Sequence, residues 1–249
     1  CAGLVIAVTA PSIGGYADRT GGRMPWVWLF ALMYLPFTWA LWWTDPNGSN
    51  IYLILLLFNL GFIAAEFMLV FVNAILPSLG SKEEIGKISG NGAAIGYWGG
   101  VLSLFIMLLL FAEGDTGKTL LGIDPVLGLN AEMREGTRSV GPFIAIWFAL
   151  FMAPFFLWVR EPQNTNRRGG VAVAMRDLKT SLKGAYQRKS LFNFLIGSML
   201  YRDALNALYA AGGFFANLVL GWSIIQIGVF GIVGAITAAI ATQIGGMFD

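Results

Sequence analysis

Histidine is absent from the 249-residue sequence, and Cys1 is its single cysteine. Without a second cysteine the chain forms no internal disulfide, and without histidine it has no Cys/His zinc site. A Ser-His-Asp triad and a Cys-His nucleophile pair are excluded for the same reason. The sequence therefore predicts a protein that is not an enzyme and that holds neither a metal ion nor a cofactor.

Charged residues are scarce: they make up 12% of the chain, whereas 57% of its residues are hydrophobic. Soluble domains usually carry about 25% charged residues, because a surface in contact with water has to be largely polar. The few charges of this chain also gather in short segments. This composition indicates that lipid surrounds most of the chain, and it predicts an all-α integral membrane protein.

Long apolar runs are separated by short polar segments, as expected for helices of about 20 residues that span a bilayer. None of the runs alternates apolar and polar residues as the strands of a membrane barrel do. The seven predicted spans are residues 1–16 (incomplete), 25–43, 51–72, 92–112, 141–159, 191–218 and 223–247. Because apolar runs lie at both ends of the chain, we expect the sequence to be an internal part of a longer protein.

Lysine and arginine residues mark one side of the predicted membrane protein. Twelve of the 16 basic residues fall in three alternate connections, at 17–24, 73–91 and 160–190. Connections rich in basic residues stay on the cytoplasmic side of a membrane, so these three are predicted to be cytoplasmic. The longest one divides the chain into residues 1–159, a basic cytoplasmic connector at 160–190, and residues 191–249.

Two segments of the chain resemble each other at an offset of 231 residues. Residues 7–18 (AVTAPSIGGYAD) and 238–249 (AAIATQIGGMFD) share six of twelve positions. The offset contains six predicted helices and the basic connector, so the second and eighth helices of two six-helix halves would end in the same turn. Two parallel six-helix repeats are an architecture of secondary transporters.

The first copy of this repeat continues into a recognisable loop. Residues 14–23 (GGYADRTGGR) resemble the G-x-x-x-D-R-x-G-R-R/K signature of the major facilitator superfamily, although Gly22 replaces its first basic residue after the glycine. Residues 73–80 (NAILPSLG), 88–100 (ISGNGAAIGYWGG) and 201–231 are similar to one branch of that superfamily. This branch contains the autophagy-related vacuolar amino-acid effluxers and their bacterial relatives.

The resemblance implies a major facilitator fold of two parallel six-helix halves, of which the sequence covers about helices two to eight. It implies a secondary active transporter, either a permease or an effluxer, that moves a small polar solute by alternating access, with an amino acid as the favoured solute. It also implies a monomer in the lipid bilayer with no nucleic-acid partner. The favoured location is the inner membrane of a bacterium, and the alternative is a vacuolar membrane.

Other functions stay open at this point. A non-transporting membrane receptor or scaffold on the same fold is the first alternative, and a membrane enzyme is the second. Whether a proton couples to transport is also open, but in a chain without histidine a proton relay would have to use a carboxylate.

The loop signature and its repeat are predicted to form a charge lock that holds the two halves in one state and breaks in another. Asp18 can accept hydrogen bonds from neighbouring arginines or from a helix N-terminus, and glycines allow helices to approach closely. The predicted gating residues are Gly14, Gly15, Asp18, Arg19, Arg23, Gly245, Gly246 and Asp249. Separately, Gly92, Gly96 and Gly100 are spaced four residues apart and predict a groove for tight helix packing.

Three ionisable residues lie within predicted spans, where a charge is costly: Glu66, Arg202 and Asp203. The resemblance puts their helices at the central cavity, with Arg202 for a carboxylate and Glu66 or Asp203 for an ammonium group or a proton. Polar residues at helical spacing extend both faces. The predicted solute or proton site comprises Asn59, Glu66, Arg202, Asp203, Asn206 and Tyr209. The alternative is a buried ion pair of Arg202 with Asp203 or Glu66 that only fixes helix packing.

Overall fold

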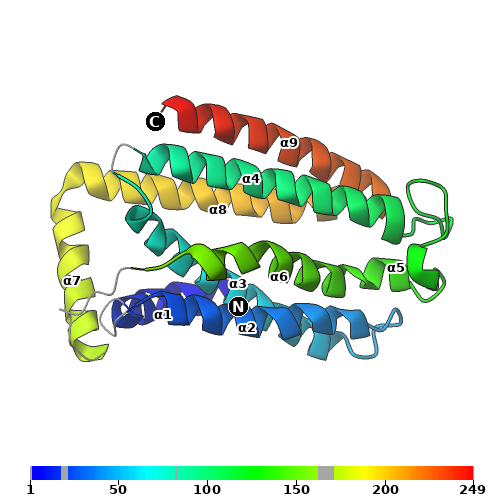
Figure 1. The fold of residues 1–249 in the computed structure, drawn as a ribbon, viewed down its shortest axis with the longest axis horizontal. Helices are drawn as coiled ribbons and strands as arrows, with labels where there is room; N and C mark the ends of the chain where they lie inside the picture. The colour runs from blue at the N-terminus through cyan, green and yellow to red at the C-terminus, as the bar shows by residue number, and fades with distance from the viewer. Residues whose placement is uncertain (1, 18–21, 82–83, 162–170, 249) are drawn as a thin grey trace.

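The structure is a computed structural model that describes residues 2–17, 22–81, 84–161 and 171–248. Within these residues the secondary structure is helical, with no strand, which confirms the predicted all-α fold (Figure 1). The α-helices are α1 (Ala2–Ala17), α2 (Met24–Trp39), α3 (Ile51–Ile75), α4 (Ile85–Ile106), α5 (Glu135–Arg138), α6 (Val140–Trp158), α7 (Val171–Gln187), α8 (Lys189–Leu218) and α9 (Ile224–Phe248). The short helices are η1 (Ala40–Trp43), η2 (Leu76–Ser78), the π-helical η3 (Met107–Phe111) and η4 (Val126–Gly128).

Five helical stretches of the described residues are long and apolar enough to cross a membrane: Met24–Trp43, Ile51–Ser78, Ile85–Phe111, Glu135–Trp158 and Ile224–Gly245. They coincide with five of the seven predicted spans, although α4 begins at Ile85 and the prediction began at 92. The other two predicted spans are also helical. α1 is short, with 16 residues, and α8 has 30 residues but carries two charges near its middle. The chain is therefore a multi-pass integral membrane protein.

The helices run back and forth between two ends of the bundle. Figure 1 shows that α1, α3, α6 and α9 end, and α2, α4 and α8 begin, at the end that α7 crosses. We call this the α7 end. The opposite end, which we call the loop end, is formed by residues 44–50, 112–134 and 219–223. The connections predicted to be cytoplasmic therefore all belong to one end.

One group of helices is built around α2, which packs against α3 and α6, while α1 packs against α3. Its core is aromatic: the rings of Phe30 and Phe67 stack at 4.8 Å. At Gly141, α6 lies so close to α2 that a Cβ there would approach the carbonyl oxygen of Thr38 to 2.6 Å. Only glycine permits this contact between the two backbones. The buried core residues are Ala17, Val27, Phe30, Ala64, Phe67, Phe71 and Ile75.

The second group joins α4 to α9, which form the most extensive helix contact of the structure. α8 packs beside this pair and touches α9 and α7. A close approach occurs at Gly228, where an added Cβ would lie 2.7 Å from a methyl group of Leu108 in η3. The shared core comprises Val101, Leu104, Leu108, Ala112, Ile232, Ala235 and Ile236.

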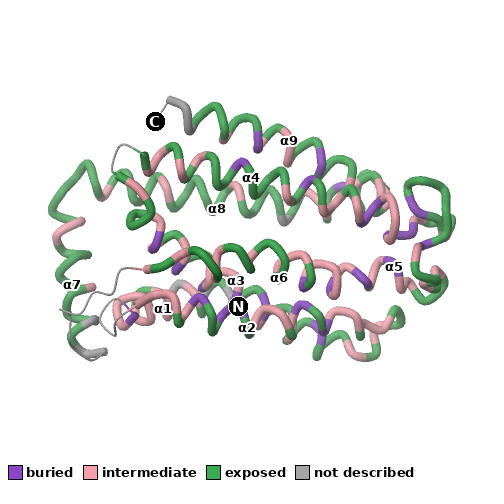
Figure 2. Tube along the Cα trace, viewed as in Figure 1, coloured by how far each residue is buried: buried purple, intermediate pink, exposed green. Residues whose placement is uncertain are grey.

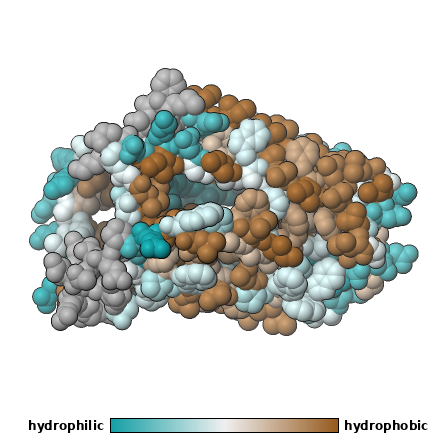
Figure 3. Space-filling model, in the orientation of Figure 1, coloured by the Kyte–Doolittle hydropathy of each residue, from teal (hydrophilic) through white to brown (hydrophobic). Residues whose placement is uncertain are grey.

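Apolar side chains cover most of the outer surface of the spans. In the most apolar stretch of each span only 11–28% of the residues are buried, so most residues of these stretches are at least partly accessible (Figure 2). On the face shown in Figure 3, hydrophobic side chains dominate the middle and hydrophilic ones gather toward the two ends. This is the pattern expected of a protein whose middle lies in hydrocarbon.

Candidate functional site

The polar stripe predicted on α8 lies near the middle of that helix. Arg202 is about 20 Å from Lys189 at 1.5 Å per residue, which places it at the depth of the hydrocarbon core. Arg202, Asp203 and Asn206 are exposed. Within the part of the chain that the structure describes, neither Arg202 nor Asp203 has an ion-pair or hydrogen-bond partner. The alternative of a buried ion pair with Asp203 or Glu66 is therefore not formed here.

A hollow opens between α4 and α6 on the face shown in Figure 3. Its floor is hydrophilic, while hydrophobic side chains are prominent elsewhere in the middle of this face. In Figure 1, α8 runs alongside and behind α4, at the edge of this opening. A polar floor at the middle of an otherwise apolar bundle can receive a polar solute, because it offers charge in a place where lipid would not.

A cavity of about 490 Å³ lies farther along α8, between that helix, α4 and α9. Tyr209, a predicted site residue, lines it together with Tyr97 of α4. Most of the remaining lining is apolar or glycine, including Gly212, Phe230 and Gly231. The polar stripe of α8 therefore leads from two charges in mid-membrane to an apolar chamber with two tyrosine side chains in its wall.

The predicted face of α3 lies apart from this chamber. Glu66 is half-buried, and the amide nitrogen of Asn59 donates to the carbonyl oxygen of Leu55 in its own helix at 2.7 Å. α3 packs mainly on α2 and α1, whereas α8 packs on α7 and α9. The structure thus brings Arg202, Asp203, Asn206 and Tyr209 together on one helix, but it does not place Glu66 against them.

Arg23 connects three elements at the α7 end. Its guanidinium donates to the carbonyl oxygen of Ala74, in the last turn of α3, at 2.6 Å. The carboxylate of Glu161, which follows α6, accepts from the backbone N–H groups of Arg23 and Met24 at 2.5 and 3.0 Å. A carboxylate at a helix N-terminus satisfies free N–H groups and complements the helix dipole. Glu161 therefore fixes the start of α2.

The other predicted gating residues are less informative. Asp18, Arg19 and Asp249 lie outside the described residues. α1 ends at Ala17 and α9 ends at Phe248, one residue before the aspartate of each repeat copy. At Gly14 and Gly245 an added Cβ would meet no atom within 4 Å, so no described helix approaches closely there. Gly15 and Gly246 lie in the last turns of the same two helices.

Glu113 organises the loop end, directly after η3 completes α4. Its side chain is fully buried, and its carboxylate accepts from the backbone N–H and the hydroxyl of Thr137, each at 2.9 Å. Arg134 completes the cluster, with its Nε 3.2 Å from Glu113 Oε1. Arg134 has a φ of 53°, in the left-handed region that is unusual for a residue other than glycine. The surrounding contacts therefore hold a strained backbone in place.

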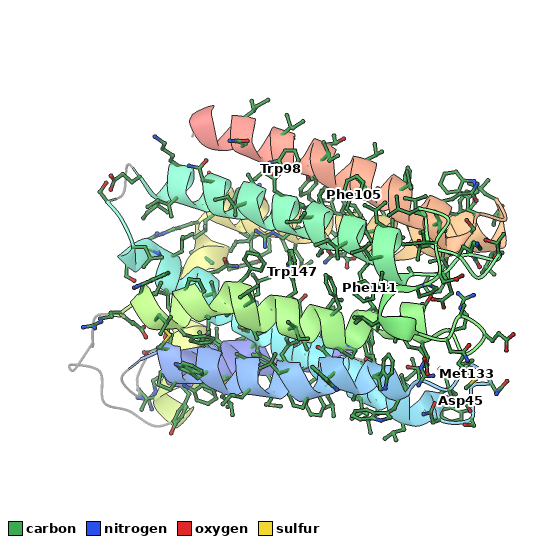
Figure 4. All side chains as sticks on the ribbon, turned by 45° about the vertical axis from the view of Figure 1, so that its right-hand side comes forward. Asp45, Trp98, Phe105, Phe111, Met133 and Trp147 are labelled. Carbon is green, nitrogen blue, oxygen red and sulfur yellow. The ribbon has the colours of Figure 1, made fainter. Side chains whose placement is uncertain are left out.

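Two further contacts tie this cluster to the first helix group. Arg138 donates to the carbonyl oxygen of Trp42 at 2.9 and 2.6 Å, and its guanidinium lies 5.3 Å from the centre of the Trp42 ring. The rings of Phe111 and Phe143, 5.9 Å apart, join the end of α4 to α6. In Figure 4, Phe111 lies in the space between α4 and α6, on the side of the loop end.

The glycine row of α4 does not form the tight contact that we predicted. At Gly92, Gly96 and Gly100 an added Cβ would meet nothing within 4 Å, so no described helix packs against them. α4 and the η3 turn that follows it use another face, carrying Val101, Leu104 and Leu108, to pack on α9. Large apolar side chains bury more surface than a glycine row does, and α9 supplies the glycine at Gly228.

Sequence reasoning missed Glu113, Glu161 and Gly228. Glu161 had a usable signal, because it is an acidic residue directly after a span, at the start of a basic connector. Gly228 also had one, since Gly228 and Gly231 share a helix face. Glu113 had none, because it is bonded to a residue 24 positions away in an irregular loop.

The sequence matches a family model over residues 2–247, nearly the whole chain, and that family is described as vacuole effluxer Atg22-like. No curated protein and no solved structure matches the chain. The family agrees with the branch that the residues 73–80, 88–100 and 201–231 resemble, and with the apolar helices of the structure. The chain belongs to the Atg22-like family of vacuole effluxers.

Proposed function

We propose that this chain is part of a secondary transporter that moves a small polar solute across its membrane by alternating access. The observation that carries the proposal is the pair of charges Arg202 and Asp203, which lie at mid-depth on α8 and have no ion-pair or hydrogen-bond partner among the residues that the structure describes. An unpaired charge at this depth is costly and is retained where it serves a function. The hollow with a hydrophilic floor between α4 and α6 supports the same function (Figure 3).

The favoured solute is an amino acid, because it carries both charges that this stripe can complement. The planar guanidinium of Arg202 suits a carboxylate, to which it can donate two parallel hydrogen bonds. Asp203 is the next residue of the same helix and suits an ammonium group. Asn206 lies one turn beyond Arg202 and adds neutral hydrogen-bonding groups.

The two parts of the chain on either side of the connector supply the moving parts of this proposal. Residues 1–159 form one unit, the connector at 160–190 joins it to the other, and residues 191–249 belong to the second. α4 and α9 meet across this division, and their contact at Gly228 and Leu108 is where the units would slide against each other. The hollow between α4 and α6 would open toward one side of the membrane and then toward the other.

Proton coupling rests on carboxylates in this proposal. Asp203 and Glu66 are the candidates, since both lie within predicted spans and neither has an ion-pair partner among the described residues. A substitution that neutralises the proton-carrying carboxylate should abolish accumulation of the solute against a gradient, but it should leave solute exchange between equal compartments intact. Measuring accumulation and exchange of the solute in cells would identify the host membrane, bacterial or vacuolar, and the direction of transport.

Reconstituted vesicles test the proposal. The purified full-length protein is expected to exchange labelled amino acids across the vesicle membrane, and Asp203→Asn and Glu66→Gln show which carboxylate supports accumulation driven by a pH gradient. Saturable binding of an amino acid with no exchange would favour a receptor or scaffold on the same fold. Neither binding nor exchange of any amino acid would contradict the proposed solute class.

A further inference from the structure

The connector helix α7 has a surface that the transport function does not use. Figure 1 shows α7 running crosswise to the bundle helices at one end. It packs against α1 and α8, and the Ser12 hydroxyl of α1 donates to the sulfur of Met175 at 3.3 Å. Ser12 lies five residues before the end of α1, or about 8 Å along that helix. α7 therefore touches the side of a membrane helix near its end, at the depth of lipid headgroups.

One face of α7 is basic. Arg176, Lys179 and Lys183 follow one another at spacings of three and four, so they project from the same side of the helix. All three are exposed, and Arg188 and Lys189 continue the positive charge into α8. α7 contains a single acidic residue, Asp177. This side of the helix therefore presents a strongly positive surface outward.

The adjoining face of α7 is apolar and only partly covered. Leu178 and Ala185 are half-buried, but Met175, Leu182 and Tyr186 remain 44%, 62% and 70% exposed. Exposed apolar side chains next to a row of lysines are typical of a helix that lies in the membrane interface. The apolar side chains reach into the acyl boundary, while the lysine stems extend their charges to the phosphates.

We propose that α7 is an interfacial anchor whose basic face, formed by Arg176, Lys179 and Lys183, binds the anionic headgroups of the adjacent lipid leaflet. The partner is the bilayer surface itself, because the apolar face of α7 matches the acyl boundary and the basic face matches the anionic headgroups. Each basic residue near an anionic surface adds attraction that high salt weakens. The inference does not depend on which solute the protein moves.

The test uses the full chain in vesicles, with a fluorophore at Leu182→Cys in a Cys1→Ser background. One set of vesicles contains phosphatidylcholine alone, and the other contains about 30 mole percent phosphatidylglycerol. The expected result is that phosphatidylglycerol shields the label from the neutral aqueous quencher acrylamide and increases quenching by a headgroup nitroxide lipid. High salt should reverse both changes.

Charge removal gives the decisive comparison. Lys179→Gln with Lys183→Gln should weaken the docking equilibrium roughly 30-fold on anionic vesicles, since two charges leave the interface. The matched control is Lys87→Gln with Arg160→Gln, two exposed basic residues at the same end but outside α7, which should have little effect. Equal shielding on both kinds of vesicle, or equal effects of both pairs, would overturn the proposal.

Discussion

At the loop end, the fully buried carboxylate of Glu113 accepts two hydrogen bonds from Thr137 and pairs with Arg134. At the α7 end, the carboxylate of Glu161 is half-buried and caps the first N–H groups of α2. Both carboxylates join segments that are far apart in the sequence. Removing a buried charge partner costs much more than removing a partly exposed one, because the groups left behind cannot turn to water.

The comparison indicates which end moves more easily. The contacts of Glu113 and Arg138 tie the segment after η3 to α5, and α5 to η1, so opening the loop end means breaking buried interactions. At the α7 end the contacts of Arg23 and Glu161 lie where water can replace them. In a two-state transporter, an end held by contacts that water can replace opens at a lower free-energy cost than an end held by buried contacts. We therefore expect the α7 end to show the larger fluctuations in the state described here.

Glu113→Ala should produce the largest effect. It leaves the N–H and hydroxyl of Thr137 without their acceptor and Arg134 without its ion-pair partner, so we expect a loss of about 3 kcal/mol in unfolding free energy. Thermal unfolding of the purified protein in detergent measures this. Glu132→Ala, an exposed acidic residue of the same loop, is the control. If both variants unfold at the wild-type temperature, the loop end is not held by Glu113.

Gly136→Ala should come next. An added Cβ would collide with the carbonyl oxygen of Phe111 and with the Glu113 carboxylate. Displacing a backbone group and a buried charge by a methyl group is expected to cost about 2 kcal/mol. Gly197→Ala in α8 is the matched control, since its Cβ would meet nothing within 4 Å and alanine favours helix. Equal melting temperatures for the two variants would contradict the close packing at the loop end.

Glu161→Gln should have a smaller effect on stability. The amide keeps an acceptor for the N–H groups of Arg23 and Met24 but loses the charge that complements the α2 dipole, which is worth about 1 kcal/mol or less. We expect a lower barrier to opening at the α7 end. Faster labelling of a cysteine introduced at Ala74, in a Cys1→Ser background, measures this opening. A loss of stability as large as that of Glu113→Ala would remove the contrast between the two ends.

The smallest expected effect concerns two carboxylates outside the spans, one at each end. The Ser49 hydroxyl lowers the pKa of Asp45 at the loop end, and the backbone N–H of Ser81 lowers the pKa of Glu84 at the α7 end. A lowered pKa in the folded state means that each contact stabilises the fold at neutral pH and that this contribution is lost as the pH falls through the folded-state pKa.

Serine substitutions separate the two causes. Ser49→Ala should return the pKa of Asp45 toward its ordinary value, because it removes the principal donor. Ser81→Ala should change the pKa of Glu84 less, because the backbone N–H remains. Carboxyl-carbon NMR titration measures both values. A larger change at Glu84 than at Asp45 would show that the assigned donors are wrong.

Much of the fold follows from the sequence, because a membrane span is defined by the length of an apolar run. The limits of α6 differ from the prediction by one residue at each end, at Val140 and Trp158. α4 starts earlier than predicted, because a helix continues into the interface where polar residues such as Lys87 and Ser89 are no obstacle. The length of an apolar run indicates which residues lie in the hydrocarbon region, but it does not indicate where the hydrogen-bonded helix begins or ends.

Contacts between helices were harder to predict. The row of Gly92, Gly96 and Gly100 shows where a close approach is permitted, but not which helix makes one. The contact that forms depends on Leu108 finding Gly228 across more than a hundred residues of sequence. Predicting the polar stripe of α8 required no knowledge of a neighbouring helix, since the helical period alone places Arg202 and Asn206 on one face. Local periodicity is therefore enough to predict this part of the site, whereas the Glu113 cluster depends on tertiary structure.

The most direct test of the proposed function is the effect of Arg202→Lys on solute affinity and on folding, measured together in the full-length protein. Lysine keeps the positive charge but cannot form the bidentate contact with a carboxylate. Because Arg202 has no partner among the described residues, the account predicts an affinity for the transported amino acid reduced about tenfold or more, with melting temperature and abundance unchanged. Unchanged affinity, or a parallel loss of abundance, would contradict the assignment of Arg202 to the solute.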